Sequence, residues 1–110
     1  MLIALSRLLQ AGARKGDTVC RYGGEEFMVL MPKVSSKIAE NRANEWRAGF
    51  EDTRLHYDKK SINATISAGI ATFNGTLSDI DEGIREADIA LYRSKASGRN
   101  RISVSEKLRA

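Results

Sequence analysis

Two adjacent glycines, Gly23 and Gly24, constrain the fold of this chain more than any other feature of its sequence. They stand between two strand-like runs, residues 18–22 and 27–31. Both central positions of a tight primed turn need positive φ, which glycine adopts without steric cost, so the pattern predicts a β-hairpin. The second run is continuously apolar, as in a strand buried on both faces, and Pro32 ends it because proline cannot donate a ladder hydrogen bond.

Hydrophobic periodicity predicts the other elements. Apolar residues at helical spacing predict helices over residues 2–13 and 36–57, and a third that begins with Ser78 as its N-cap and ends at Gly98. Alternating apolar and polar residues predict a strand over 63–71, and a short strand over 101–104 follows the last helix. This order predicts the α/β class, an α+β sandwich with helices on a mixed sheet.

Composition limits the classes of protein to which the chain can belong. The 110 residues, 42% hydrophobic and 29% charged, fit a single globular domain over 1–110 with a polar tail at 103–110. Cys20 is the only cysteine, so no internal disulfide can form, which predicts a cytoplasmic, reducing location. The longest unbroken apolar run, 27–31, is far shorter than the roughly 20 residues of a membrane-spanning helix. We therefore expect no membrane contact by this chain.

The net charge of +4 suits a polyanionic partner, either a nucleic acid or a nucleotide phosphate. No Arg/Lys-rich tract is interleaved with aromatic residues, so a nucleic-acid partner is not expected.

Glu25 and Glu26 follow the two glycines directly and precede the apolar strand. Glycines let a bulky ligand approach the backbone, and an acid beside them can hold a divalent metal or accept a proton. Strand side chains alternate between faces, so only one of the two acids is expected to be the principal metal ligand. On these grounds alone, a solvated hairpin end with two surface acids is the favoured interpretation.

The segment RYGGEEF at 21–27 resembles the signature of the GGDEF family in its GGEEF form. Residues 65–70 are similar to a later strand of that family, and 87–95 and 97–101 resemble its C-terminal helix and the segment after it. These blocks occur in the family's order and cover most of the chain. The resemblance implies a ferredoxin-like, nucleotidyl-cyclase-like mixed sheet.

The resemblance also implies an enzyme, a diguanylate cyclase. Such a nucleotidyltransferase condenses two GTP molecules into cyclic di-GMP and pyrophosphate for bacterial signal transduction, as a homodimer, with Mg²⁺ or Mn²⁺ as cofactor. An alternative is a non-catalytic receptor module that binds cyclic di-GMP. A third, weaker alternative is a purely structural dimerisation fragment.

The family pattern assigns roles to the signature loop. Glu25 resembles the metal-binding acid and candidate base, and Glu26 matches the second acid of the catalytic motif. Gly23 and Gly24 would lie against the nucleotide substrate.

Lys95 and Arg99 match the basic pair that holds the GTP phosphates in the family. Their spacing places them at the last turn of a helix and in the loop beyond it, where cations can converge on one anion. Without the resemblance, cations that complement the helix dipole are the more common explanation.

Arg14 and Asp17 fit the RxxD pattern that many family members carry as a product-inhibition site for cyclic di-GMP. Arginine can bind a phosphate or a guanine edge, and aspartate can accept from the guanine amino group. A surface ion pair is the alternative. An arginine on the next helix often contributes in the family, and Arg42 and Arg47 are both candidates.

The chain departs from the family pattern at its start. The family has a first strand and helix that carry a metal-binding aspartate and guanine-binding residues, and nothing in residues 1–16 offers those groups. A single matched carboxylate leaves a hard cation short of oxygen ligands, so we expect this chain alone to be incomplete and inactive. A missing central strand would also expose ladder groups and favour dimerisation or strand exchange. A sensor or membrane domain could lie upstream.

Overall fold

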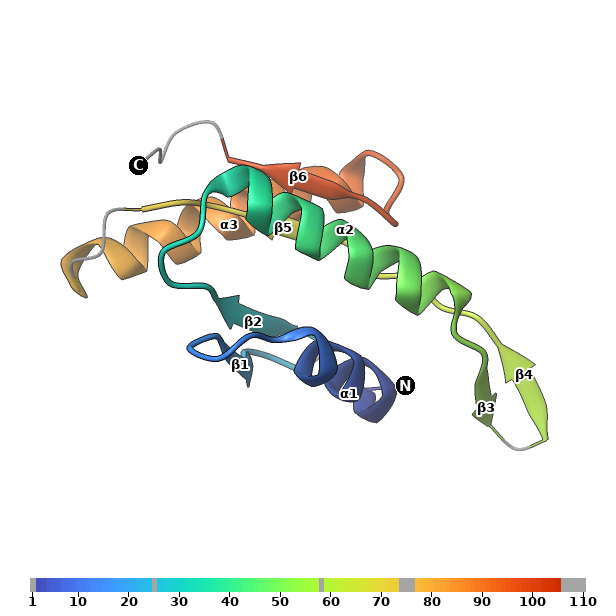
Figure 1. Ribbon diagram of the computed structural model, residues 1–110. Helices are drawn as coiled ribbons and strands as arrows, with labels where there is room; N and C mark the ends of the chain where they lie inside the picture. The colour runs from blue at the N-terminus through green and yellow to red at the C-terminus, as the bar shows by residue number, and fades with distance from the viewer. Residues whose placement is uncertain (1, 25, 58, 74–76, 106–110) are drawn as a thin grey trace.

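The computed structural model describes residues 2–24, 26–57, 59–73 and 77–105 (Figure 1). Its helices are α1 (Leu2–Gly12), α2 (Ser36–Asp52) and α3 (Leu77–Ala96). Its strands are β1 (Thr18–Arg21), β2 (Phe27–Leu30), β3 (Leu55–Tyr57), β4 (Lys60–Ile62), β5 (Ala68–Ile70) and β6 (Ile102–Val104). The predicted α/β class is confirmed.

The strands form three separate pairs rather than one continuous sheet. β1 and β2 are antiparallel, with Thr18 opposite Leu30 and Arg21 opposite Phe27. β3 and β4 are also antiparallel, whereas β5 and β6 are parallel, so the predicted mixture of pairings is present. The pairs stay separate because the described ranges contain no strand that bonds to both β2 and β5.

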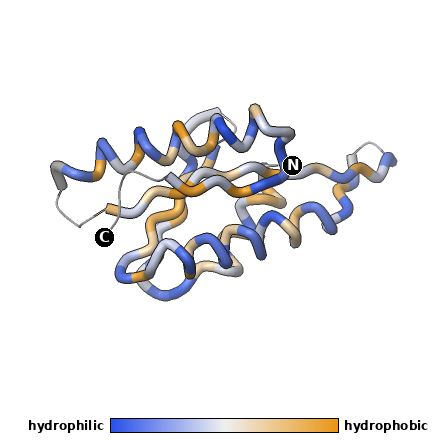
Figure 2. The backbone as a smooth tube through the Cα atoms, turned by 90° about the horizontal axis from the view of Figure 1, so that it is seen from above, coloured by the Kyte–Doolittle hydropathy of each residue, from blue (hydrophilic) through white to orange (hydrophobic). Residues whose placement is uncertain are grey.

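The best-packed part of the molecule is the layer in which β5 and β6 lie between α2 and α3 (Figures 1 and 2). Phe50 on α2 is 1% exposed, and Ala90 and Ser94 on α3 are fully buried. The Ser94 hydroxyl hydrogen-bonds to Ala68 O at 2.9 Å and to Ser103 Oγ at 2.7 Å, which satisfies its polar group inside the core. A Cβ at Gly69 would overlap the α3 backbone at Ala87 and Leu91, so glycine permits the close approach of β5 and α3.

The N-terminal part is attached to this layer through helix packing. α1 contacts α2, and the end of α1 at Gly12 lies against the Trp46 ring. A groove of about 290 Å³, lined by Ile3, Val19 and Phe27 among others, separates α1 from the β1–β2 hairpin. None of the four residues of β2 is fully buried, contrary to the expectation from their apolar run.

The predicted helix over 36–57 is too long, because α2 ends at Asp52 and the β3–β4 hairpin follows. Thr53 has extended backbone angles and donates from its hydroxyl to Gly49 O at 2.7 Å, while its N–H donates to Phe50 O. These contacts close the last turn of α2 locally. At the other end, Ser35 is the N-cap and accepts from Ile38 N.

Three other expectations differ in detail. The predicted strand over 63–71 is reduced to β5, and Ser78 lies inside α3 instead of capping it. The turn after β1 is not a primed two-residue turn, because the glycines with positive φ in the described ranges are Gly16 and Gly98. Arg21 pairs with Phe27, so residues 22–26 form a longer loop, in which Tyr22 N donates to Glu26 O at 2.8 Å.

No helix within the described ranges has both the length and the apolar character needed to span a bilayer.

Candidate functional site

The signature loop lies at the tip of the β1–β2 hairpin and is held by an arginine. The Arg21 guanidinium donates to Gly23 O at 3.3 Å and to Gly24 O at 2.5 Å. Sequence reasoning gave Arg21 no role beyond completing the motif. A cation placed just before two loop glycines, whose carbonyls have no ladder partners, is the signal that could have identified this contact.

Gly23 and Gly24 are both exposed. A Cβ at Gly24 would meet no atom within 4 Å, so this side of the loop is open to a ligand. A Cβ at Gly23 would contact the Glu26 side chain at 3.6 Å, which shows that this carboxylate folds back over the loop. Glu25 lies outside the described residues, so the expected division of roles between Glu25 and Glu26 stays a prediction.

The described part of the chain does not by itself form a metal centre. It contains no group of three or more His, Cys, Asp or Glu side chains arranged to hold an ion. Hard divalent cations take several oxygen ligands, so the described residues alone do not fit a Mg²⁺ or Mn²⁺ ion.

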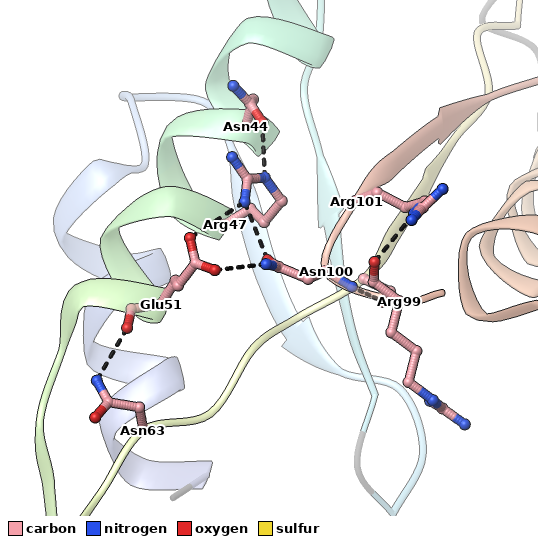
Figure 3. Close-up of polar contacts among 8 residues, drawn as sticks. Asn44, Arg47, Glu51, Asn63, Arg99, Asn100 and Arg101 are labelled. Carbon is pink, nitrogen blue, oxygen red and sulfur yellow. Dashed lines mark hydrogen bonds and ion pairs between the residues drawn. The ribbon is translucent and has the colours of Figure 1, made fainter. Parts of the chain in front are cut away.

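Lys95 lies in the last turn of α3, and its side chain is exposed. Arg99 follows in the loop with a left-handed backbone, φ 64°; its N–H donates to Ser94 O at 2.9 Å. The Arg99 side chain extends away from its neighbours (Figure 3). Neither side chain has a polar partner among the described residues, although the negative end of the helix dipole supports positive charge there.

Arg14 and Asp17 are the ends of a tight turn. Asp17 N donates to Arg14 O at 2.9 Å, and Arg14 N donates to the Asp17 carboxylate at 2.9 Å. Gly16, the third residue of the turn, has φ 97°, a region that glycine adopts without strain. The RxxD spacing therefore has a structural explanation as a turn closed by its own aspartate.

Arg42 is the arginine that reaches this turn. Its Nη1 lies 2.8 Å from Asp17 Oδ2, and its Nη2 donates to Gly12 O at 2.7 Å. The guanidinium also lies 5.1 Å from the centroid of the Trp46 ring, within the range of a cation–π contact. The hydrogen bond from Arg14 N lowers the pKa of Asp17 below 3.8, burial opposes this, and Arg42 lowers it further.

Arg47, the other candidate, belongs to a different cluster (Figure 3). It donates to Asn44 Oδ1 at 2.8 Å and to Asn100 Oδ1 at 3.0 Å, and Asn100 Nδ2 donates to Glu51 Oε2 at 2.6 Å. This cluster, which sequence reasoning missed, attaches the loop after α3 to α2. The spacing of Arg47 and Glu51 was visible in the sequence, but the Asn100 partner depends on the fold. An open groove of about 530 Å³ lies beside Arg47.

Comparison with known proteins identifies the family to which the chain belongs. The family model described as "Diguanylate cyclase, GGDEF domain" matches residues 1–101. Diguanylate cyclase A of Treponema denticola is 38% identical over 106 residues, which cover 96% of this chain and 29% of that protein. Diguanylate cyclase DgcM of Escherichia coli K12 is 42% identical over 106 residues, 93% of this chain and 24% of that protein.

A solved structure agrees with these relatives. The GGDEF domain of DgcB from Caulobacter crescentus, crystallised in complex with c-di-GMP, matches with a TM-score of 0.87 and 26% identity, over 96% of this chain and 63% of that one. The chain spans less than a third of the length of the two relatives and about two thirds of this solved domain. The match over residues 1–101 and the shared fold show that this chain belongs to the GGDEF domain family of diguanylate cyclases.

Proposed function

We propose that this chain is part of the catalytic domain of a diguanylate cyclase, which condenses two GTP molecules into cyclic di-GMP. The signature loop carries the proposal. Arg21 holds the carbonyls of Gly23 and Gly24, and the side of Gly24 where a Cβ would project is open. A nucleotide can therefore approach the loop backbone closely.

The proposed reaction is nucleotidyl transfer. A ribose 3′-oxygen bonds to the α-phosphorus of the opposing GTP, its proton passes to a base, and the bond to pyrophosphate breaks. Glu25 is the proposed metal-binding acid and base, and Glu26 supports the loop. Lys95 and Arg99 bind the phosphates, which is supported by their exposure and their lack of polar partners in the described ranges.

The GGDEF family uses a divalent metal, and we propose Mg²⁺ or Mn²⁺ for this member. The ion would neutralise phosphate charge when bound. Because the described residues gather no sufficient ligand set, we propose that this chain alone does not turn over GTP and that two complete domains act as a homodimer. GTP binding by this chain and its assembly into a dimer in the presence of GTP can both be measured directly.

The alternative function, a receptor for cyclic di-GMP, is favoured by one observation. The Arg14–Asp17 turn is fully formed in a chain whose described residues hold no metal cluster. Arg14, with its exposed side chain, is the proposed ligand of the product's phosphate. In this case the chain binds cyclic di-GMP without catalysing its formation.

Calorimetric titration tests both functions. Cyclic di-GMP, and GTP with Mg²⁺, are titrated into the chain and its Arg14→Ala and Lys95→Ala variants. We expect Arg14→Ala to abolish product binding only, and Lys95→Ala to weaken GTP binding about tenfold, as expected for one lost charge-assisted contact. Lys60→Ala, which removes an exposed lysine of β4, is the matched control and should change neither. GTP turnover that disappears in Glu25→Ala would contradict the proposed inactivity.

A further inference from the structure

The two signature residues of the RxxD turn face different surroundings. Arg14 has an exposed side chain, whereas the Asp17 side chain is only 5% exposed. The partner that covers Asp17 is Arg42, whose own side chain is 8% exposed. The aspartate is therefore already bound by a cation of the same chain at the place where a guanine ligand would need it.

Arg42 contacts three separate parts of the fold: the turn at Asp17, the end of α1 at Gly12, and the Trp46 ring on its own helix. The contact to Gly12 is an aligned hydrogen bond. The contact to Asp17 is close but not aligned, because Arg42 Nη1 is buried without a hydrogen-bond partner of good geometry in the described ranges. The aligned hydrogen bond to Gly12 O does not involve Asp17, so it can still hold the guanidinium when the ion pair opens.

We propose that the Arg42–Asp17 ion pair competes with guanine for Asp17, and so weakens binding of a guanine dinucleotide at the Arg14–Asp17 turn. This inference rests on the proposed product site. A guanine edge presents two neighbouring N–H donors, which match the two oxygens of a carboxylate. Asp17 Oδ2 already accepts from Arg14 N and lies 2.8 Å from Arg42, so the ion pair is one of two contacts that restrict this oxygen before both oxygens can face a ligand.

The proposal predicts a change in binding affinity opposite in sign to the change expected from the loss of a positive charge alone. Arg42→Met removes a positive charge near an anionic ligand, which by long-range electrostatics should weaken binding. Competition predicts tighter binding instead, because Asp17 is released. Methionine retains an unbranched apolar stem beside Trp46, so the packing of the site is largely kept.

The test is calorimetric titration of cyclic di-GMP into the 110-residue chain and its Arg42→Met variant. We expect Arg42→Met to bind about fivefold to tenfold more tightly, the range that corresponds to roughly 1 to 1.4 kcal/mol. Arg47→Met is the matched control, since it removes an arginine from the same helix that does not touch Asp17, and should not tighten binding. Equal or weaker binding by Arg42→Met would overturn the competition.

A second ligand distinguishes the contribution of Asp17 to binding from the contribution of the phosphate contacts. Cyclic di-AMP has the same phosphate backbone but lacks the guanine donors, so its binding should not gain from Arg42→Met. An equal gain for both dinucleotides would overturn the role assigned to Asp17. Absence of cyclic di-GMP binding in every folded variant would overturn the product site itself, and the competition with it.

Trp46 provides a measurement on the unmodified chain in case Arg42→Met does not fold. It is the only tryptophan, and Arg42 lies over its ring. Opening of the ion pair changes the environment of the indole, so its fluorescence should change during titration with cyclic di-GMP and saturate together with the calorimetric signal. Heat of binding without any change in Trp46 fluorescence would contradict the proposal.

Discussion

The two halves of this molecule are packed to different degrees. In the C-terminal layer, β5 lies so close to α3 that only glycine fits at position 69, and Phe50 and Ala90 are almost completely buried. In the N-terminal part, every residue of β2 is only half-buried, and a groove of about 290 Å³ runs between α1 and the hairpin. The signature loop thus lies on the less tightly packed part, and the proposed phosphate-binding residues lie on the more tightly packed part.

The largest expected effect is the loss of close packing in the C-terminal layer. Gly69→Ala places a Cβ in the backbone of α3 at Ala87 and Leu91, and we expect it to reduce the free energy of unfolding by about 3 kcal/mol. Urea denaturation followed by circular dichroism measures the change. Gly24→Ala is the control in the N-terminal part, because its Cβ would meet no atom within 4 Å; an equal loss in both would remove the distinction between the halves.

The next effect concerns the Arg42–Asp17 ion pair, which connects the halves. Asp17→Asn leaves Arg42 buried without a counter-charge, and we expect a loss of about 2 kcal/mol at pH 7. Because the folded pKa of Asp17 is lowered, its stabilisation is complete above 3.8 and is lost as the pH falls further. Urea denaturation at pH 7 and at pH 3 should therefore show a smaller difference between variant and parent at the acidic pH.

The exposed Asp52 serves as the control for that measurement. Asp52→Asn should change the unfolding free energy by less than about 0.5 kcal/mol at either pH. A similar loss of unfolding free energy in Asp17→Asn and Asp52→Asn would show that general electrostatics, and not the buried Arg42–Asp17 pair, stabilises the contact between the two halves.

Hydrogen exchange measures the difference between the halves directly. Amides in β1 and β2 should exchange through opening that costs roughly 1 to 2 kcal/mol less than opening of β5 and β6, because few buried apolar contacts support the hairpin. Equal protection in both pairs would mean that α1 stabilises the hairpin more than its burial indicates.

The smallest effect is expected at Arg99. This residue has a left-handed backbone, φ 64°, which costs a side-chain-bearing residue about 1 kcal/mol relative to glycine. Arg99→Gly should therefore raise the unfolding free energy slightly while it weakens GTP binding. Reduced stability on thermal denaturation would contradict this account of position 99.

Local patterns predicted much of the fold. The periodicity of α1 and α3 and the glycines after β1 indicated the right elements in the right order. The end of α2 was missed because Phe50 and Tyr57 fall on one helical stripe, while the contacts of Thr53 that end the helix are short-range and polar. The primed turn was wrong because Gly–Gly pairs also occur in longer loops, where other contacts set φ.

The candidate site was predicted as a set of residues but not as an arrangement. The motifs indicated Lys95, Arg99, Arg14 and Asp17. In the fold, the side chains of Lys95 and Arg99 are exposed, whereas Arg42 covers the side chain of Asp17. Arg42 and Arg47 could not be distinguished, since both lie on α2 and only tertiary packing decides which one faces the turn. Arg21 was overlooked because its partners are backbone carbonyls, so its only sequence signal is its place just before the two loop glycines.

The β3–β4 hairpin has a practical consequence for experiments. It projects beyond the end of α2 (Figure 1), its strands pair with one another, and Asn63 anchors its base to Glu51 O at 3.0 Å. Lengthening a surface turn costs little entropy, about 0.6 kcal/mol for each doubling of the loop. This hairpin is therefore the place to insert an affinity tag or a fluorescent acceptor, which would allow Trp46 and the signature loop to be observed without altering either.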